Sequence, residues 1–305
     1  MAIKVTGSRR PGIPPYVGVP VSSSHGLRPG HFGATYLGSQ HNPFDTGGDP
    51  SHADFQVKNL TPPPGMTIRR LDDREGLRKK FDQWHRKLGE THAFDAMDRF
   101  DQQAFELTAG STAREAFDIS LEDPSVRDRY GRNNWGQSAL LARRLVEAGS
   151  TFVTLHFGGW DQHWNLEGAM NVKLPRVDAA VSSLLVDLED RGLRDQVLVV
   201  VCGEFSRTPQ MNNGQGSVTG KGTPGRDHWP NSMSVLLSGG GLRMGQVIGA
   251  TNRRAEEPVR RIMNSNCLLS TVYNRFGIDA DHAYYDNTGR PVPILTDGEP
   301  ISELL

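Results

Sequence analysis

The sequence predicts an α/β fold with a mostly parallel central sheet flanked by helices. Two apolar runs of β type, 151–157 and 196–202, each follow a segment of helical periodicity, which is the rhythm of βαβ units. The second run reads Gln-Val-Leu-Val-Val-Val-Cys and has no polar alternation. A run of this kind is typical of a parallel strand that is covered on both faces.

The second half of the chain contains the elements of this predicted core. In order, they are helix 136–148, strand 151–157, helix 174–191, strand 196–202, strand 232–237 and helix 266–276. Gly149 and Gly192 follow the first two helices, where glycine is favoured as a C-cap. We therefore expect residues 135–305 to form the α/β core that carries the functional site.

The first 134 residues divide into two further segments. Residues 1–66 are rich in glycine, proline, serine and histidine and show no sustained period of helix or strand, so we expect a loop-rich segment packed on the core. Residues 67–134 show helical spacing, with a helix expected at 96–107, another beginning at Ser111, and a turn or helix at Asp123. This second segment is expected to be a helical insertion or cap.

Composition excludes several classes of protein. Lysine and arginine number 34 against 35 for aspartate and glutamate, so no net field drives the chain toward nucleic acid or an anionic membrane. No apolar stretch is long enough to cross a bilayer, and no secretory signal opens the sequence, which leaves the compartment undetermined. Cys202 and Cys267 are expected to be small core residues rather than a disulfide. The sequence leaves the oligomeric state open.

Three short polar clusters lie beside the predicted strands. Residues 158–163 and 203–209 directly follow strands, and residues 225–230 precede one. In an open α/β sheet, ligands bind at strand ends, where the backbone stops pairing and side chains converge. The clusters contain carboxylates and imidazoles, which are ligands for divalent ions. The sequence therefore predicts a metal site at this edge of the sheet.

Asp161 and His163 are the candidate ligands of the first cluster. They lie two residues apart, so an extended backbone projects both side chains to the same side. The alternative interpretation is an aspartate turn beside a surface histidine. Gly158 and Gly159 permit close backbone approach, which favours the metal interpretation.

Glu204 and Arg207 belong to the second cluster and allow two interpretations. A carboxylate at the end of an apolar strand is costly unless it meets a cation or several donors. A salt bridge between the two side chains would satisfy it. In the other interpretation Glu204 binds a metal and Arg207 faces an anionic substrate oxygen, because guanidinium groups suit phosphate and sulfate.

Asp227 and His228 are adjacent in the third cluster, so in a strand their side chains point to opposite sides. We expect one of them to bind the ion and the other to orient a neighbouring ligand. The glycine-rich stretch 212–225 has no Gly-Lys-Ser/Thr phosphate-loop pattern. It is expected to be a mobile loop near the site rather than a nucleotide cradle.

Together with 135–149 and 288–293, the three clusters closely resemble the bacterial domain of unknown function 1501 family, from Pro14 to the C-terminus. That family is grouped with the alkaline phosphatase and sulfatase superfamily. The resemblance implies an alkaline-phosphatase-like layered fold with one or two divalent metals at the rim of its sheet. It also implies the metal ligands, which are Asp161, His163, Glu204 and His228, with Asp227 as a further candidate. Zinc, calcium, magnesium and manganese all stay open as the ion.

Two departures from the superfamily pattern are visible. Members begin with a strand that ends in an aspartate ligand near a serine, threonine or modified cysteine nucleophile, and no such strand precedes Tyr16. The resemblance thus implies a chain without its N-terminal strand and with little activity alone, whose longer relatives are exported. The familiar D-x-x-x-H and D-H-G signatures are also replaced by D-x-H and G-E-F, which leaves phosphatase activity itself open.

Two functions remain. The first is a metal-dependent hydrolase of phosphate or sulfate esters, acting on a small molecule or a polysaccharide, with Arg207 as the catalytic side chain that stabilises charge. The second is a non-catalytic module that binds an anionic or sulfated polysaccharide. The aromatic side chains Trp160, Trp164 and Trp229 suit sugar contact in either case.

Overall fold

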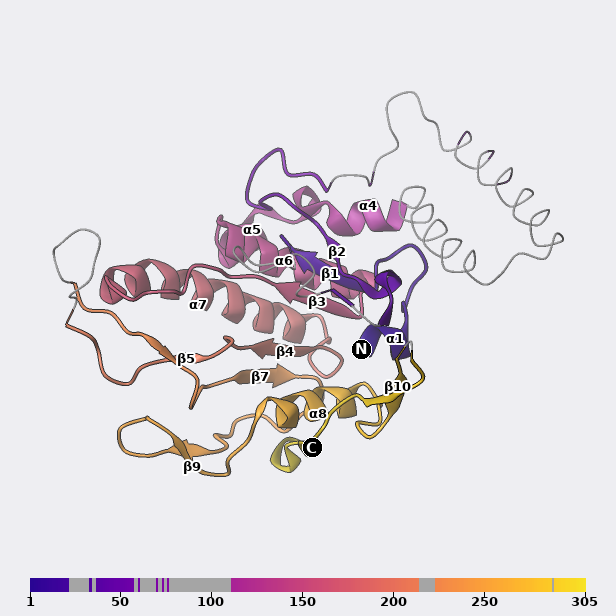
Figure 1. The fold of residues 1–305 in the computed structure, drawn as a ribbon. Coiled ribbons are helices and arrows are strands. Elements are labelled where there is room, and N and C mark those ends of the chain that lie inside the picture. The colour runs from indigo at the N-terminus through magenta and orange to yellow at the C-terminus, as the bar shows by residue number, and fades with distance from the viewer. Residues whose placement is uncertain are drawn as a thin grey trace. The chain divides into compact units, whose positions relative to one another are not determined.

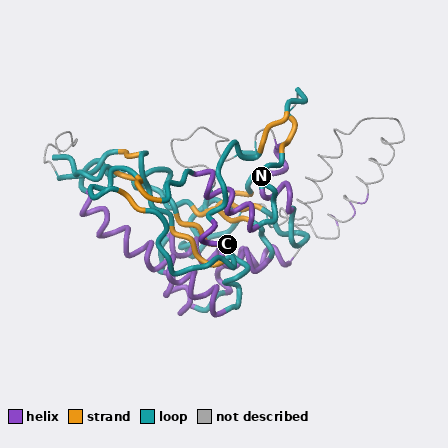
Figure 2. Tube along the Cα trace, turned by 90° about the horizontal axis from the view of Figure 1, so that it is seen from below, coloured by secondary structure: helices purple, strands orange, loops and turns teal. Residues whose placement is uncertain are grey.

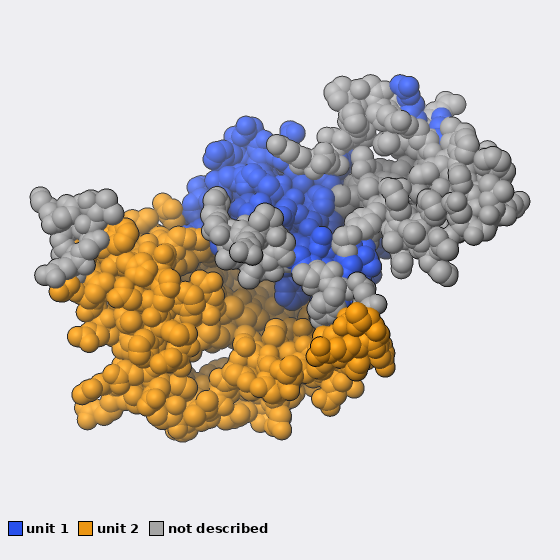
Figure 3. All heavy atoms as spheres, viewed as in Figure 1, with its two compact units in different colours: residues 1–156 blue, residues 157–305 orange. Residues whose placement is uncertain are grey.

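The computed structural model describes residues 1–21, 33–34, 37–57, 60, 70, 73, 76, 111–213, 223–286 and 288–305. These form two compact units, residues 1–156 and residues 157–305, which Figure 3 colours separately. Both contain helices, strands and long loops (Figures 1 and 2), which confirms a mixed α/β class. The helix expected at 96–107 lies outside the described residues.

A three-stranded parallel sheet lies at the centre of the first unit, in the order β2-β1-β3 (Figure 1). β1 (Tyr16–Val19) pairs with β2 (Phe44–Asp45) on one side and with β3 (Phe152–Leu155) on the other. Val17 and Val19 are fully buried. The strand predicted within 151–157 is thus confirmed.

Residues 1–66, which were expected to be rich in loops, also contain the short strands β1 and β2 and the helix α1 (Ala2–Thr6). β1 is four residues long and lies between prolines, so no local period marks it as a strand. Its conformation comes from long-range pairing with β3, where Tyr16 is opposite Phe152. Their rings meet edge to face with centroids 5.4 Å apart.

Helices before β3 follow the capping signals in the sequence. They are α4 (Ser111–Phe117), α5 (Pro124–Tyr130) and α6 (Asn134–Ala148), with 3₁₀ turns at Ser39–His41 and Ile119–Leu121. The Asp123 side chain accepts a hydrogen bond from the backbone N–H of Ser125, 2.8 Å away, and so caps α5. Gly149 closes α6 in the left-handed conformation at φ 116°. The helix start predicted at Asp123 and the helix end predicted at Gly149 are confirmed.

A buried ion network joins α6 to the preceding 3₁₀ turn. Arg143 is 1% exposed, and its guanidinium lies 2.5 Å from carboxylate oxygens of both Glu122 and Glu147. Arg144 also pairs with Glu122. Burial alone would lower the pKa of Arg143, but hydrogen bonds to Glu122 and Glu147 outweigh it and raise the pKa. The network keeps a buried cation charged and paired.

The strands of the second unit form short antiparallel pairs throughout its described residues. They are β4 (Leu198–Val201) with β7 (Leu236–Gly239), β5 (Ser206–Arg207) with β6 (His228–Trp229), β8 (Ala250–Thr251) with β9 (Pro258–Arg260), and β10 (Ala283–Tyr285) with β11 (Pro291–Pro293). The strand predicted at 196–202 exists, but the prediction that it is parallel and covered on both faces is wrong. β4 runs antiparallel to β7, and Val200 is 36% exposed. An apolar run favours a strand without specifying the direction of its neighbour.

Pairing also shifts the strand predicted at 232–237 to 236–239, where it lies opposite β4. α7 (Leu166–Asp190) begins earlier than the predicted 174. Asn165 precedes it in the left-handed conformation without capping it through its side chain, and Pro175 lies inside the helix. The sequence therefore carries no clear signal for its start. α8 (Ser265–Arg275) agrees with the predicted helix.

A small core in the second unit holds β4 and β7 against the C-terminal end of the chain. Leu242, Ile301 and Leu304 are buried, and Leu198, Leu237 and Cys267 pack against them. Both cysteines are free, as predicted, but Cys202 is exposed rather than in the core. None of the described helices has the length and apolar character needed to span a bilayer.

Candidate metal centre

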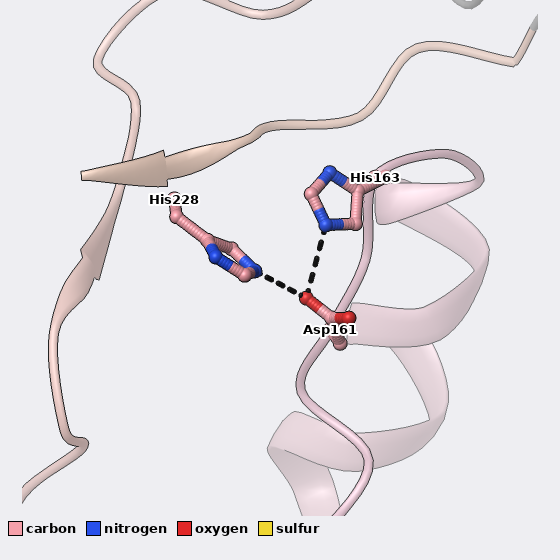
Figure 4. Close-up of side chains that lie close together, drawn as sticks. All are labelled: Asp161, His163 and His228. Carbon is pink, nitrogen blue, oxygen red and sulfur yellow. Dashed lines mark hydrogen bonds and ion pairs between the residues drawn. The ribbon is translucent and has the colours of Figure 1, made fainter. Parts of the chain in front are cut away.

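Asp161 and His163 lie in the loop that precedes α7, within the second unit. Two tight turns shape this loop: the N–H of Gln162 donates to the carbonyl of Trp160 at 3.0 Å, and that of His163 donates to the carbonyl of Asp161 at 3.3 Å. The loop is therefore more compact than the extended backbone expected from sequence. Its two side chains still meet (Figure 4).

The short β5–β6 ladder positions the residues of the other two clusters. Arg207 and His228 are directly opposite in its register, and directly opposite residues of an antiparallel pair share one face of the ladder. Just beyond the ladder, the N–H of Thr208 donates to the carbonyl of Asp227 at 2.9 Å, and the N–H of Asp227 donates to the Thr208 hydroxyl at 3.1 Å. Residues that are 21 positions apart in sequence (207 and 228) thus become neighbours.

One oxygen of Asp161 is the meeting point of the site. Its Oδ1 lies 2.7 Å from Nε2 of His228, 3.1 Å from Nε2 of His163 and 2.6 Å from Nη2 of Arg207. Figure 4 shows both imidazoles directed at this oxygen. The ligand atoms of Asp161, His163 and His228 all lie within 4.8 Å of one another. The geometry therefore places three possible metal ligands together.

His163 lies between two carboxylates. Its Nδ1 is 2.7 Å from Oδ1 of Asp227, and its Nε2 faces Asp161. A neutral imidazole has a single N–H. If Nδ1 donates that proton to Asp227, the lone pair of Nε2 faces the Asp161 oxygen. Nε2 and this oxygen are then both acceptors and repel each other, unless the ring gains a second proton or a cation binds to both atoms. A metal-bound histidine commonly uses this arrangement, with its second nitrogen on a carboxylate.

Electrostatics keep Asp161 ionised. Hydrogen bonds from His228 and then Arg207 lower its pKa from 3.8 to about 2. The side chain is nevertheless 67% exposed, while those of His163 and His228 are 32% and 49% exposed. The site is therefore a shallow surface site in which a ligand could reach an ion directly.

Hydrogen bonds from the Asn212 side chain and from the backbone hold the three segments of the site together. The side-chain amide of Asn212 donates to the carbonyl of His163 at 2.8 Å, and its oxygen accepts from the N–H of Gly225 at 3.0 Å. The N–H of Arg226 donates to the carbonyl of Gln162 at 3.1 Å. A Cβ atom on Gly225 would lie 2.2 Å from the carbonyl carbon of His163, so only glycine permits this close approach.

The donor set of two imidazoles and one carboxylate fits a transition metal. Imidazole suits zinc and iron, whereas calcium and magnesium prefer oxygen ligands. Ligands about 2.0–2.2 Å from a zinc ion lie about 3.3–3.5 Å apart in tetrahedral geometry. The two separations from Asp161, 2.7 and 3.1 Å, would have to widen to reach this spacing. A tetrahedral ion held by these three residues of the described chain would have one further position for another ligand.

Some of the predicted site residues come together in the structure, and others do not. Asp161, His163 and His228 come together, and Asp227 contacts His163 rather than joining them. Arg207 binds Asp161, so the predicted alternative of a Glu204–Arg207 salt bridge is not formed. Glu204 is exposed, and it is not part of the three-residue group found in the described chain.

Two residues that contribute to the site were not predicted from sequence. Asn212 links two of its segments, and the Phe205 ring packs against the His228 imidazole with centroids 4.6 Å apart. Asn212 was grouped with a loop expected to be mobile, whose residues 214–222 lie outside the described part. Nothing local distinguishes a bridging asparagine from a loop asparagine. Its role depends on the partners that the fold supplies.

Residues 2–305 match the model of a known protein family described as "Protein of unknown function (DUF1501)". The chain therefore belongs to this family, as the sequence motifs predict. The comparisons of this chain with the curated proteins and with the solved structures found no match.

Proposed function

We propose that this member of the DUF1501 family is a metal-dependent hydrolase of phosphate or sulfate esters. One observation carries the proposal: Asp161, His163 and His228 offer three ligand atoms within 4.8 Å of one another at an exposed surface. The carboxylate–histidine pair of Asp227 and His163 supports it, because second-shell carboxylates of this kind orient metal-binding imidazoles. Among the four ions considered from sequence, the donor set favours zinc.

The neighbouring residues suit an anionic ester. A zinc ion held by the three ligands supplies Lewis acidity, which polarises an ester oxygen. Arg207 lies beside the ligands and presents a guanidinium, whose geometry matches phosphate and sulfate oxygens. Asp227 keeps the Nε2 of His163 directed toward the ion. Glu204 is kept as a proposed further ligand because the resemblance implies it and its side chain is exposed shortly before β5.

We also propose that the chain is distantly related to the alkaline phosphatase and sulfatase superfamily. The order of the three ligands along the chain, an aspartate and a histidine followed by a later histidine, is similar to the order that the resemblance to alkaline phosphatases and sulfatases implies. The proposed relationship includes an active site built on the same principle.

A binding module is the second candidate function. Trp164 is 44% exposed, and its ring centroid lies 6.4 Å from that of His163. An exposed aromatic ring beside an ion and an arginine suits a sulfated sugar. Under this alternative the ion and Arg207 hold the sulfate group without cleaving its ester.

Elemental analysis of the purified protein tests the site. We expect about one equivalent of zinc in the parent protein, and a loss of most of it in His228→Ala and Asp161→Asn. His282→Ala is the matched control, since this exposed histidine of the same unit lies outside the cluster. Iron in place of zinc would indicate redox chemistry, because iron oxygenases use the same donor set. Absence of any metal, or metal retained in both site variants, would refute the proposal.

A panel of aryl phosphate and aryl sulfate esters then separates the two functions. Hydrolysis that is abolished by a chelator and by His228→Ala, and retained in His282→Ala, supports the hydrolase. Stoichiometric metal and saturable binding of a sulfated oligosaccharide without turnover of any ester would support the binding module instead.

A further inference from the structure

Arg207 is held at the site by two kinds of contact. Its Nη1 donates to the backbone carbonyl of Arg226 at 3.1 Å, and its Nη2 donates to that of Trp160 at 2.8 Å. The third contact is to the Asp161 carboxylate, at 2.6 Å. The two carbonyls belong to segments that the surrounding hydrogen bonds already fix, so they keep the guanidinium at the site whatever the carboxylate binds.

Asp161 cannot serve an ion and its present partners through the same oxygen. Oδ1 meets Nε2 of His228, Nε2 of His163 and Nη2 of Arg207. A nitrogen that donates a proton to Oδ1 has no lone pair for an ion, and the Arg207 cation repels a second cation on that oxygen. A divalent ion that binds this same oxygen therefore competes with Arg207 for it.

We infer that Arg207 alternates between two anionic partners, the Asp161 carboxylate in the metal-free protein and a tetrahedral oxyanion in the metal-loaded protein. This inference rests on the proposed metal site and adds an order of events to it. Metal binding releases N–H groups of Arg207 that remain anchored beside the ion. A phosphate or sulfate group then meets the ion and the guanidinium together. Metal and anion binding are consequently coupled, so that each strengthens the other by the same factor.

Titration calorimetry with inorganic phosphate tests this coupling in the parent protein. We expect phosphate to bind at least about tenfold more tightly to zinc-loaded than to chelator-treated protein, within the usual range of coupling between sites. Phosphate should raise the zinc affinity by the same factor. Sulfate in place of phosphate shows which oxyanion the site prefers.

Two variants separate the inference from a structural role of Arg207. Arg207→Gln should reduce the effect of zinc on phosphate affinity to the part that the ion alone supplies. It should leave zinc binding, without phosphate, as tight as in the parent or tighter. A merely structural arginine predicts weaker zinc binding. Asp161→Asn should strengthen phosphate binding in the metal-free protein, because the guanidinium has lost its carboxylate. Arg207→Lys provides a charged variant if the glutamine variant does not fold.

The outcomes distinguish the inference from the proposed function. Equal phosphate affinity with and without zinc, in a parent protein that binds zinc, overturns the inference and leaves the metal site standing. Unchanged phosphate affinity in metal-free Asp161→Asn overturns it as well. A parent protein that binds no metal refutes both.

Discussion

The most specific expectation from this site concerns Asp227, which does not belong to the three-ligand group. Its Oδ1 lies 2.7 Å from Nδ1 of His163, on the side of the ring opposite Asp161. Asp227→Asn keeps an oxygen acceptor for the same hydrogen bond and removes only the negative charge. We expect the variant to fold normally and to bind zinc more weakly, because a carboxylate partner raises the basicity of the ligating imidazole.

The size of the loss follows from the exposure of the pair. Removing an outer-shell carboxylate costs about 10- to 100-fold in metal affinity. The Asp227 side chain is 57% exposed, so water screens its interaction with His163. We therefore expect the lower end, about tenfold, which corresponds to about 1.4 kcal/mol of binding free energy.

Competition with a chromophoric zinc chelator at pH 7.5 measures this difference. Asp178→Asn is the matched control, since it removes the same charge from an exposed position on α7. The reasoning is refuted if Asp227→Asn binds zinc as tightly as the parent. It is also refuted if the variant loses as much affinity as His163→Ala, because Asp227 would then be a direct ligand.

Three further predictions concern packing and charge. Gly225→Ala should destabilise the second unit by about 1–3 kcal/mol and lower its zinc content, because the added Cβ would lie 2.2 Å from the His163 backbone. The prediction is wrong if the variant matches the parent both in urea unfolding and in metal content. Asp161 has its pKa lowered from 3.8 to about 2, so its ionic contacts stabilise the metal-free protein above pH 3.8 and cease to do so as the pH falls through about 2. In chelator at pH 6, the unfolding free energies of the parent and Asp161→Asn should differ by at most about 1 kcal/mol, because the side chain is exposed. The difference should be smaller at pH 2.5. A difference that grows on acidification would contradict the lowered pKa of Asp161. Glu122→Gln should lower the free energy of unfolding by about 3 kcal/mol, because the charge of the buried Arg143 is then only partly paired. Zinc affinity should be unchanged. A melting temperature equal to that of the parent would show that the ion network contributes no stability.

Much of the helical structure could be read from local signals. The Asp123 cap, the Gly149 end of α6 and the boundaries of α8 agree with the structure because capping depends on residues within one turn of the helix end. The start of α7 was placed too late because Asn165 gives no side-chain capping bond. Helix ends that lack a local signal depend on the contacts of the folded chain.

Strands were predicted less well, for a related reason. The run at 196–202 identified β4 but not its antiparallel partner, and β1 carried no recognisable period at all. The pairing of a strand depends on groups far away in sequence, such as Phe152 opposite Tyr16. Neither direction nor register of pairing can be read from one strand alone.

For the site, the sequence by itself determined the family and the types of side chain present, including aspartates and histidines that are able to hold a metal ion. Only the tertiary structure decided which of these side chains meet. It brings Asp161, His163 and His228 together, places Asp227 against His163 and pairs Arg207 with Asp161. Glu204 lies outside the three-residue group. The physical reason is that side-chain type sets which ions and hydrogen bonds are possible. Distances of about 3 Å between residues dozens of positions apart arise only when the backbone brings their segments together.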